Sequence, residues 1–170
     1  GADQGVTRSE LEKLALFAGL GGRVDLATAQ ACVGDLAGLS LEDALFAATA
    51  GDVVATDRAL ELAIAEGATS VGVLRGMLLH LQKLQRARAA MADGASAGEA
   101  VKAVRPPVFY RREAVFVQAL RLWHDEALQG ACVRVWEAER ACKRTGSPAE
   151  TISRSMVLGV AQRAAAARRR

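Results

Sequence analysis

The sequence predicts an all-α fold, and three observations support that prediction. Apolar residues recur at helical spacing over long stretches, and no segment of useful length alternates between apolar and polar residues as a strand would. Glycines and capping residues divide the chain into segments of helical length. Hydrophobic residues make up 51% of the chain and aromatic residues only 4%, so small and aliphatic side chains must form a closely packed helical core rather than a disordered chain.

The first part of the chain predicts two short helices. Thr7 and Glu10 lie at capping-box spacing before the apolar positions of the first helix, which Gly19 is expected to end. Asp25 can cap the second helix. Two short helices joined by a glycine-rich turn bury little surface on their own. Residues 1–39 are therefore expected to be the remainder of a small helical subdomain, and the start of the chain without an initiator methionine suggests a piece of a longer protein.

Residues 40–91 predict three consecutive helices with tight breaks. Ser40 is the expected N-cap of the first helix, and acidic residues follow it in the first turn. Gly51 is expected to end this helix and Asp52 to cap the second, which runs over about 53–66. Its expected buried face consists of Val53, Leu60 and Ile64.

The third of these helices is the longest and runs over about 70–91. Either Thr69 or Ser70 can cap it. Its expected buried face consists of Val71, Leu74, Leu78 and Leu81. Leu79 lies on roughly the opposite side, and a helix that is apolar on two sides is either central in the core or covered by a partner chain. Both interpretations remain open, and Leu79 is the candidate interface residue.

The next two helices are separated by a pair of prolines. Ser96 and Glu99 start a short helix by the capping-box pattern, and Pro106 and Pro107 end it. A helix over about 109–123 follows. Its expected buried face consists of Phe109, Phe116, Leu120 and Trp123.

The last two helices are joined by a short polar loop. Asp125 begins the first of them, which extends to about Lys143. Ser147 is the expected N-cap of the final helix, with proline at its first position. The expected buried faces consist of Leu128, Cys132, Val135 and Cys142 in one helix and Ile152, Met156 and Val160 in the other.

No motif in the chain predicts catalysis, a metal site or a cofactor. There is no glycine-rich phosphate-binding loop of the Gly-x-x-x-x-Gly-Lys type. His80 and His124 have no cysteine or carboxylate partners at metal-site spacing, so structural roles are expected for both. Three scattered cysteines, with no signal peptide and no membrane-spanning apolar run, favour a cytoplasmic protein with reduced thiols.

Basic residues offer a possible contact with nucleic acid. The net charge of +3 permits such a partner without requiring one. Lys143 and Arg144 lie in the loop before the final helix, where two cations and the free N–H groups of a helix start can hold a phosphate. The alternative is that they stabilise the negative end of the preceding helix. A stand-alone nucleic-acid-binding module would add Arg86 and Arg88 to this pair.

The order of these features resembles one known family. Gly51-Asp52, Leu60, Gly67 and the leucine-rich helix from Leu74 to Leu84 resemble the start of the collar domain in the delta subunit of the bacterial DNA polymerase III clamp loader. The resemblance continues through VFYRREAVFVQAL and EAERACKRTGSPAE, and the beginning of the chain looks like the end of that family's lid subdomain. It spans nearly the whole chain, and it depends on the ordered series rather than on one specific motif.

The resemblance implies a role in assembly. In this family the delta subunit opens the sliding clamp through an N-terminal ATPase-like domain without hydrolysing ATP, and its C-terminal domain joins other subunits in a ring-shaped collar. Residues 1–39 would then be the remainder of the lid, and residues 40–170 the collar domain. The implied partners are the other loader subunits and, in the assembled complex, DNA; the clamp would be contacted only by the N-terminal domain. A generic helical-repeat scaffold is a further possibility, but the chain has no fixed repeat period.

Overall fold

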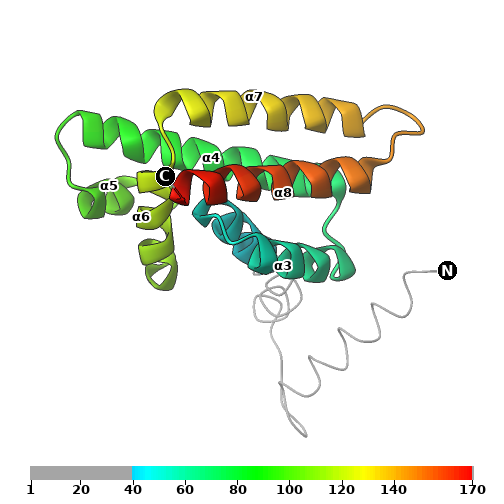
Figure 1. Ribbon diagram of the computed structural model, residues 1–170, viewed down its shortest axis with the longest axis horizontal. Coiled ribbons are helices and arrows are strands. Elements are labelled where there is room, and N and C mark those ends of the chain that lie inside the picture. Colours follow the sequence, from blue (N-terminus) through cyan, green and yellow to red (C-terminus); the bar gives the residue numbers. More distant parts are fainter. Residues whose placement is uncertain (1–39, 170) are drawn as a thin grey trace, which may run out of the picture.

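Helices form every regular element of residues 40–169, which are the residues that the computed structural model describes (Figure 1). The described part begins with a helix over residues 40–50. The elements that follow are α3 (Val53–Ala65), α4 (Ser70–Ala92), α5 (Ala97–Ala103), the 3-10 turn η1 (Tyr110–Arg112), α6 (Glu113–Leu122), α7 (Asp125–Cys142) and α8 (Ala149–Arg168). The predicted all-α fold is confirmed. The predicted subdomain of residues 1–39 lies outside the described residues.

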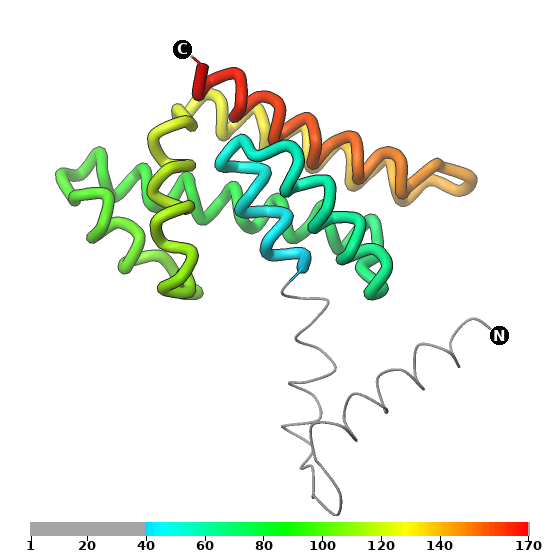
Figure 2. The backbone as a smooth tube through the Cα atoms, turned by 60° about the horizontal axis from the view of Figure 1, so that its bottom comes forward, coloured from blue at the N-terminus to red at the C-terminus, as the bar shows by residue number. Residues whose placement is uncertain are grey.

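Three long helices form the centre of the bundle. α4, α7 and α8 pack against one another, with α7 running antiparallel to the other two (Figure 1). α3 packs against α8, while α5 and α6 lie near the C-terminal end of α4 (Figure 2). Because α4 contacts helices on several sides, it buries more than one stripe. Its buried residues are Val73, Leu74, Met77, His80, Leu81, Leu84 and Ala87.

Local hydrogen bonds explain where several helices begin. The Asp52 carboxylate caps α3, as predicted, by accepting a hydrogen bond from a backbone N–H of the first turn at 2.9 Å. Thr69 rather than Ser70 caps α4. Ser96 and Glu99 form the complete capping box before α5, in which each side chain accepts a hydrogen bond from the other residue's backbone N–H.

One predicted N-cap is wrong, and a second, Ser40, is the first described residue. Ser40 is helical and buried, and the start of its helix is outside the described residues. Ser147 does not cap α8, because its hydroxyl donates a hydrogen bond backwards to the Cys142 carbonyl at 3.0 Å and Pro148 occupies the N-cap position. In this loop the free carbonyl at the end of α7 competes for the serine side chain.

Each of the five predicted buried faces is only partly correct. In α3 and α4 the predicted residues Val53, Ile64, Val71 and Leu78 are only partly buried. Phe109 is 54% exposed and precedes α6, because the chain forms the 3-10 turn before it enters the helix. The helical spacing therefore does not extend back to it, although the other three members of that face, Phe116, Leu120 and Trp123, are buried. In α8, Ile152 and Met156 are only partly buried. The buried residues of α8 are Ser153, Val157, Val160, Ala161 and Ala164.

Gly51 lies where the end of the first described helix meets α8. Its backbone has φ +81°, in the left-handed region that glycine adopts without a steric penalty. A Cβ atom at this position would lie 2.7 Å from the Ala165 nitrogen and 2.9 Å from the Ala164 carbonyl carbon. Since these are backbone atoms of a packed helix, they cannot move aside as a flexible side chain could.

We expect Gly51→Ala to lower the free energy of unfolding by roughly 2–5 kcal/mol, from left-handed strain together with overpacking. Gly67→Ala is the matched control, because Gly67 has φ +100° but no neighbour within 4 Å of the place that an alanine methyl group would occupy. Strain alone should cost the control about 1–2 kcal/mol. Urea denaturation followed by circular dichroism measures both variants. Equal losses would contradict the close approach at Gly51.

Candidate interaction surfaces

The first features considered are metal-binding groups and membrane-spanning helices among the described residues. Residues 40–169 contain no group of three or more histidine, cysteine, aspartate or glutamate side chains that could hold a metal ion. Within the same range, no helix is long and apolar enough to cross a membrane.

His80 has the structural role that its isolation in the sequence predicts. Its Nε2 lies 2.9 Å from the Thr49 hydroxyl, and its ring packs edge-on against Phe46 and Phe116. Burial, together with smaller contributions from the nearby cations Lys83 and Arg112, lowers the pKa of His80 to about 3. His80 is therefore a neutral hydrogen-bonding partner in the core at physiological pH.

The cysteines in the described part are poor nucleophiles. Cys142 is buried, and burial together with the Glu139 carboxylate raises the pKa of its thiol. Cys132, which the spacing predicts in the core, is only partly buried, and desolvation raises its pKa as well. Both thiols stay protonated at neutral pH, whereas reactive cysteines need a thiolate. His124 is exposed at the start of α7 and has neither thiol beside it.

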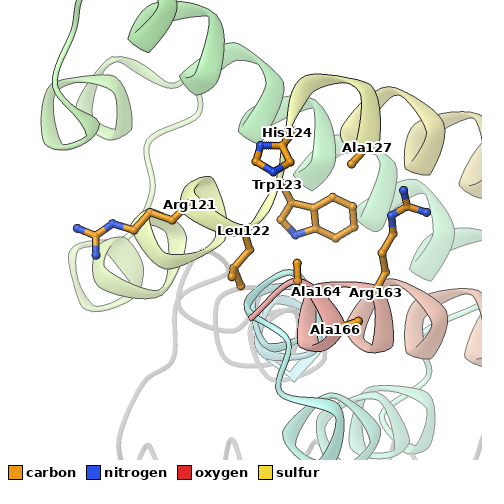
Figure 3. Close-up of a pocket in the computed structure, with 9 residues that line it drawn as sticks. Arg121, Leu122, Trp123, His124, Ala127, Arg163, Ala164 and Ala166 are labelled. Atoms are coloured by element: carbon orange, nitrogen blue, oxygen red, sulfur yellow. The ribbon is translucent and has the colours of Figure 1, made fainter. Parts of the chain in front are cut away.

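One hollow of about 460 Å³ lies between the end of α6, the start of α7 and the C-terminal part of α8 (Figure 3). The Trp123 indole and the Arg163 side chain lie side by side in it, whereas Arg121 points away from them (Figure 3). None of its nine lining residues carries a carboxylate, hydroxyl or thiol. His124 therefore has no nucleophile or carboxylate partner in this hollow, which argues against acid–base or covalent catalysis there.

A second hollow, of about 950 Å³, contains carboxylates that are already paired. The Arg112 guanidinium lies 2.8 Å from Glu42 and 2.9 Å from Asp43, and it stacks over the Phe46 ring at 5.3 Å. This cluster joins the first described helix to the start of α6. Because the two carboxylates share one partly buried cation, neither is placed as a free general base.

The structure places Lys143 and Arg144 in the exposed loop between α7 and α8. The Lys143 ammonium donates to the Glu139 carboxylate at 2.6 Å, and Arg75 donates to the same oxygen at 3.0 Å. These hydrogen bonds, from Lys143 first and Arg75 second, lower the pKa of Glu139. Lys143 thus occupies the C-terminal end of α7, as the helix-stabilising alternative expects. Arg144 is exposed one residue later.

Arg86 and Arg88 lie at the other end of the bundle. Arg88 is paired with Asp125 at the start of α7, and Arg86 donates to the Arg105 carbonyl at 3.2 Å. The 18 residues of α7 separate this end from the Lys143 loop, which corresponds to about 27 Å along a helix. The four cations considered for a stand-alone nucleic-acid-binding module therefore do not form one patch.

Large apolar side chains remain on the outer helix faces. Leu79 is 59% exposed, so the core interpretation is wrong for this residue, and the interface interpretation stays a prediction. Sequence periodicity missed Trp136, which is half-exposed on α7 with the Arg140 guanidinium over its ring at 4.8 Å. The sequence signal that could have identified Trp136 is its position directly after Val135, a predicted buried residue, because neighbouring residues on a helix point in different directions. The remaining large exposed apolar residues of the described part are Val54, Leu62, Phe109, Tyr110 and Val133.

Comparisons with known proteins found no matching family model, no matching curated protein and no matching solved structure. The surfaces described above combine exposed apolar side chains with arginines. Aromatic residues and arginine are enriched at protein interfaces, where they often contribute most of the binding energy.

Proposed function

We propose that this chain is an assembly domain of a bacterial clamp loader, formed by the C-terminal part of the delta subunit. The helical bundle docks beside the corresponding domains of other loader subunits and holds the collar together while the loader places the sliding clamp on primed DNA. The chain itself carries out no catalysis. The observation that supports this proposal best is the exposed Leu79, an apolar side chain on the outer face of the central helix.

The outer faces provide the type of surface that docking requires. Obligate interfaces are large and apolar, resembling a core that has been cut in half. Leu79 on α4 and Trp136 on α7 supply exposed apolar area on two helices of the bundle. Tryptophan and arginine are the residues that most often dominate binding energy, and the stacked pair of Trp136 and Arg140 provides both.

A DNA contact in the assembled loader is the second part of the proposal. The loop containing Lys143 and Arg144 is exposed, and α8 begins without a side-chain N-cap. A phosphate near this loop would meet Arg144 and the N–H groups of the first turn of α8. Two cations release few counterions, so this contact becomes significant only when other subunits hold the DNA in place.

Reconstitution with the other loader subunits from the same genome tests the proposal. We expect the chain to elute with them as one complex in size-exclusion chromatography, and to show no ATPase activity alone. Each component run separately is the control. If no complex forms and the chain alone binds DNA tightly, with strong salt dependence at physiological ionic strength, the stand-alone nucleic-acid-binding module is the correct alternative.

A further inference from the structure

A narrow groove lies beside Leu79, between the first described helix and α4. Its volume is about 250 Å³, and apolar side chains on its wall include Leu41, Leu45 and Pro106. Small-molecule sites usually have volumes of roughly 300–1,000 Å³, so the groove fits one or two side chains better than a whole cofactor.

Gly76 allows the two helices that form the groove to approach closely. A Cβ atom at this position would lie 3.2 Å from Leu45 Cδ1 and 3.5 Å from Leu41 Cδ2. A larger residue would therefore push these leucines or fill the space between the helices. The groove lies beside this helix contact, and the exposed side chain of Leu79 is part of its lining.

The charges around the groove are mainly positive. Lys83 and Arg86 line it, and the hydrogen bond from Arg86 to the Arg105 carbonyl helps to hold the guanidinium in place. The carboxylate among its described lining residues, Glu42, is paired with Arg112 at 2.8 Å. An apolar surface therefore lies next to two cations that have no compensating carboxylate in the lining.

We propose that this groove binds an acidic, amphipathic segment of a neighbouring loader subunit. A large apolar side chain of that segment packs against Leu79, and its carboxylates meet Lys83 and Arg86. This inference rests on the proposed function and specifies the chemistry of the partner. The charge favours an anionic partner. The aliphatic wall favours a protein over a nucleic acid, because the aromatic rings in the lining, Phe46 and His80, are buried and cannot stack with a base.

Three single variants of the full chain test the groove, with the remaining loader subunits as the binding partner. Leu79→Glu and Lys83→Glu should each weaken the complex by about tenfold or more in a titration. Leu79→Glu replaces the apolar contact with a charge, and Lys83→Glu places a carboxylate opposite the carboxylates of the partner segment. Lys83→Glu should also reduce the dependence of affinity on salt. Leu62→Glu is the matched control, since Leu62 is similarly exposed but lies on α3.

The outcomes separate this inference from the proposed function. If the wild-type chain binds no loader subunit, the proposed function fails. If it binds and both groove variants bind as tightly as the Leu62→Glu control, only the groove assignment fails. If Lys83→Glu weakens DNA binding by the assembled loader but leaves subunit affinity unchanged, the groove is a nucleic-acid contact and the proposal is overturned. Circular dichroism spectra equal to that of the wild type verify that each variant folds.

Discussion

Replacing Trp123 with alanine should lower the free energy of unfolding by about 3–5 kcal/mol, the range for deleting a large aromatic side chain from a packed core. Trp123 is 1% exposed, and its indole N–H donates to the Thr49 carbonyl at 2.9 Å. That carbonyl belongs to the last turn of its helix, where carbonyl groups lack an intrahelical partner. The variant therefore loses both buried apolar surface and the group that satisfies the helix end.

Two further variants separate these contributions. Trp123→Phe keeps most of the apolar volume but leaves the Thr49 carbonyl without its donor, so we expect a smaller loss of about 1–3 kcal/mol. Trp136→Ala is the matched control, because the same residue type is half-exposed on α7 and a surface change usually alters stability by about 0.5 kcal/mol or less. Urea denaturation measures all three. If Trp136→Ala lowered the free energy of unfolding as much as Trp123→Ala, the packing of Trp123 in the core would not explain its effect on stability.

Acidification should destabilise the fold through His80. Its pKa is about 3 in the folded chain and 6.5 when unfolded, so the unfolded state takes up the proton first. The stabilisation that depends on neutral His80 is fully present above pH 6.5 and is lost as the pH falls towards 3. Each pH unit in this window removes about 1.4 kcal/mol, which amounts to roughly 3–4 kcal/mol between pH 6.5 and pH 4.

The variant His80→Gln isolates this effect, because glutamine can still hydrogen-bond to Thr49 but does not titrate. Its unfolding free energy should fall less steeply than that of the wild type between pH 6.5 and pH 4. Glu99 and Glu139 have lowered pKa values, from their hydrogen bonds with Ser96 and with Lys143 respectively, but they titrate in both proteins and cancel in the comparison. Parallel pH profiles would rule out the buried neutral histidine.

The sequence predicted the features that depend on nearby residues. The caps Asp52 and Ser96 and the helix end at Gly51 were predicted correctly, because each depends on bonds within a few residues. Ser147 was predicted wrongly because a carbonyl at the end of the preceding helix takes its hydroxyl. Phe109 was predicted wrongly because the helical spacing was extended across a 3-10 turn.

Long-range contacts could not be predicted from spacing. Arg112 pairs with Glu42 and Asp43, which lie about seventy positions earlier in the chain. The hydrogen bond between Trp123 and Thr49 is equally remote in sequence. The exposure of Leu79 also depends on how helices pack around α4, so the sequence left two interpretations open; the packing excludes burial of Leu79 in the core, and its role at an interface stays a prediction.

Sedimentation velocity of the wild-type chain with the remaining loader subunits tests the proposed docking role most directly. At micromolar concentration and physiological salt, the proposal predicts that the chain sediments with the other subunits in one complex, and that Leu79→Glu shifts the chain towards the free species. A wild-type chain that sediments alone at every subunit concentration tested would contradict the proposed role in loader assembly.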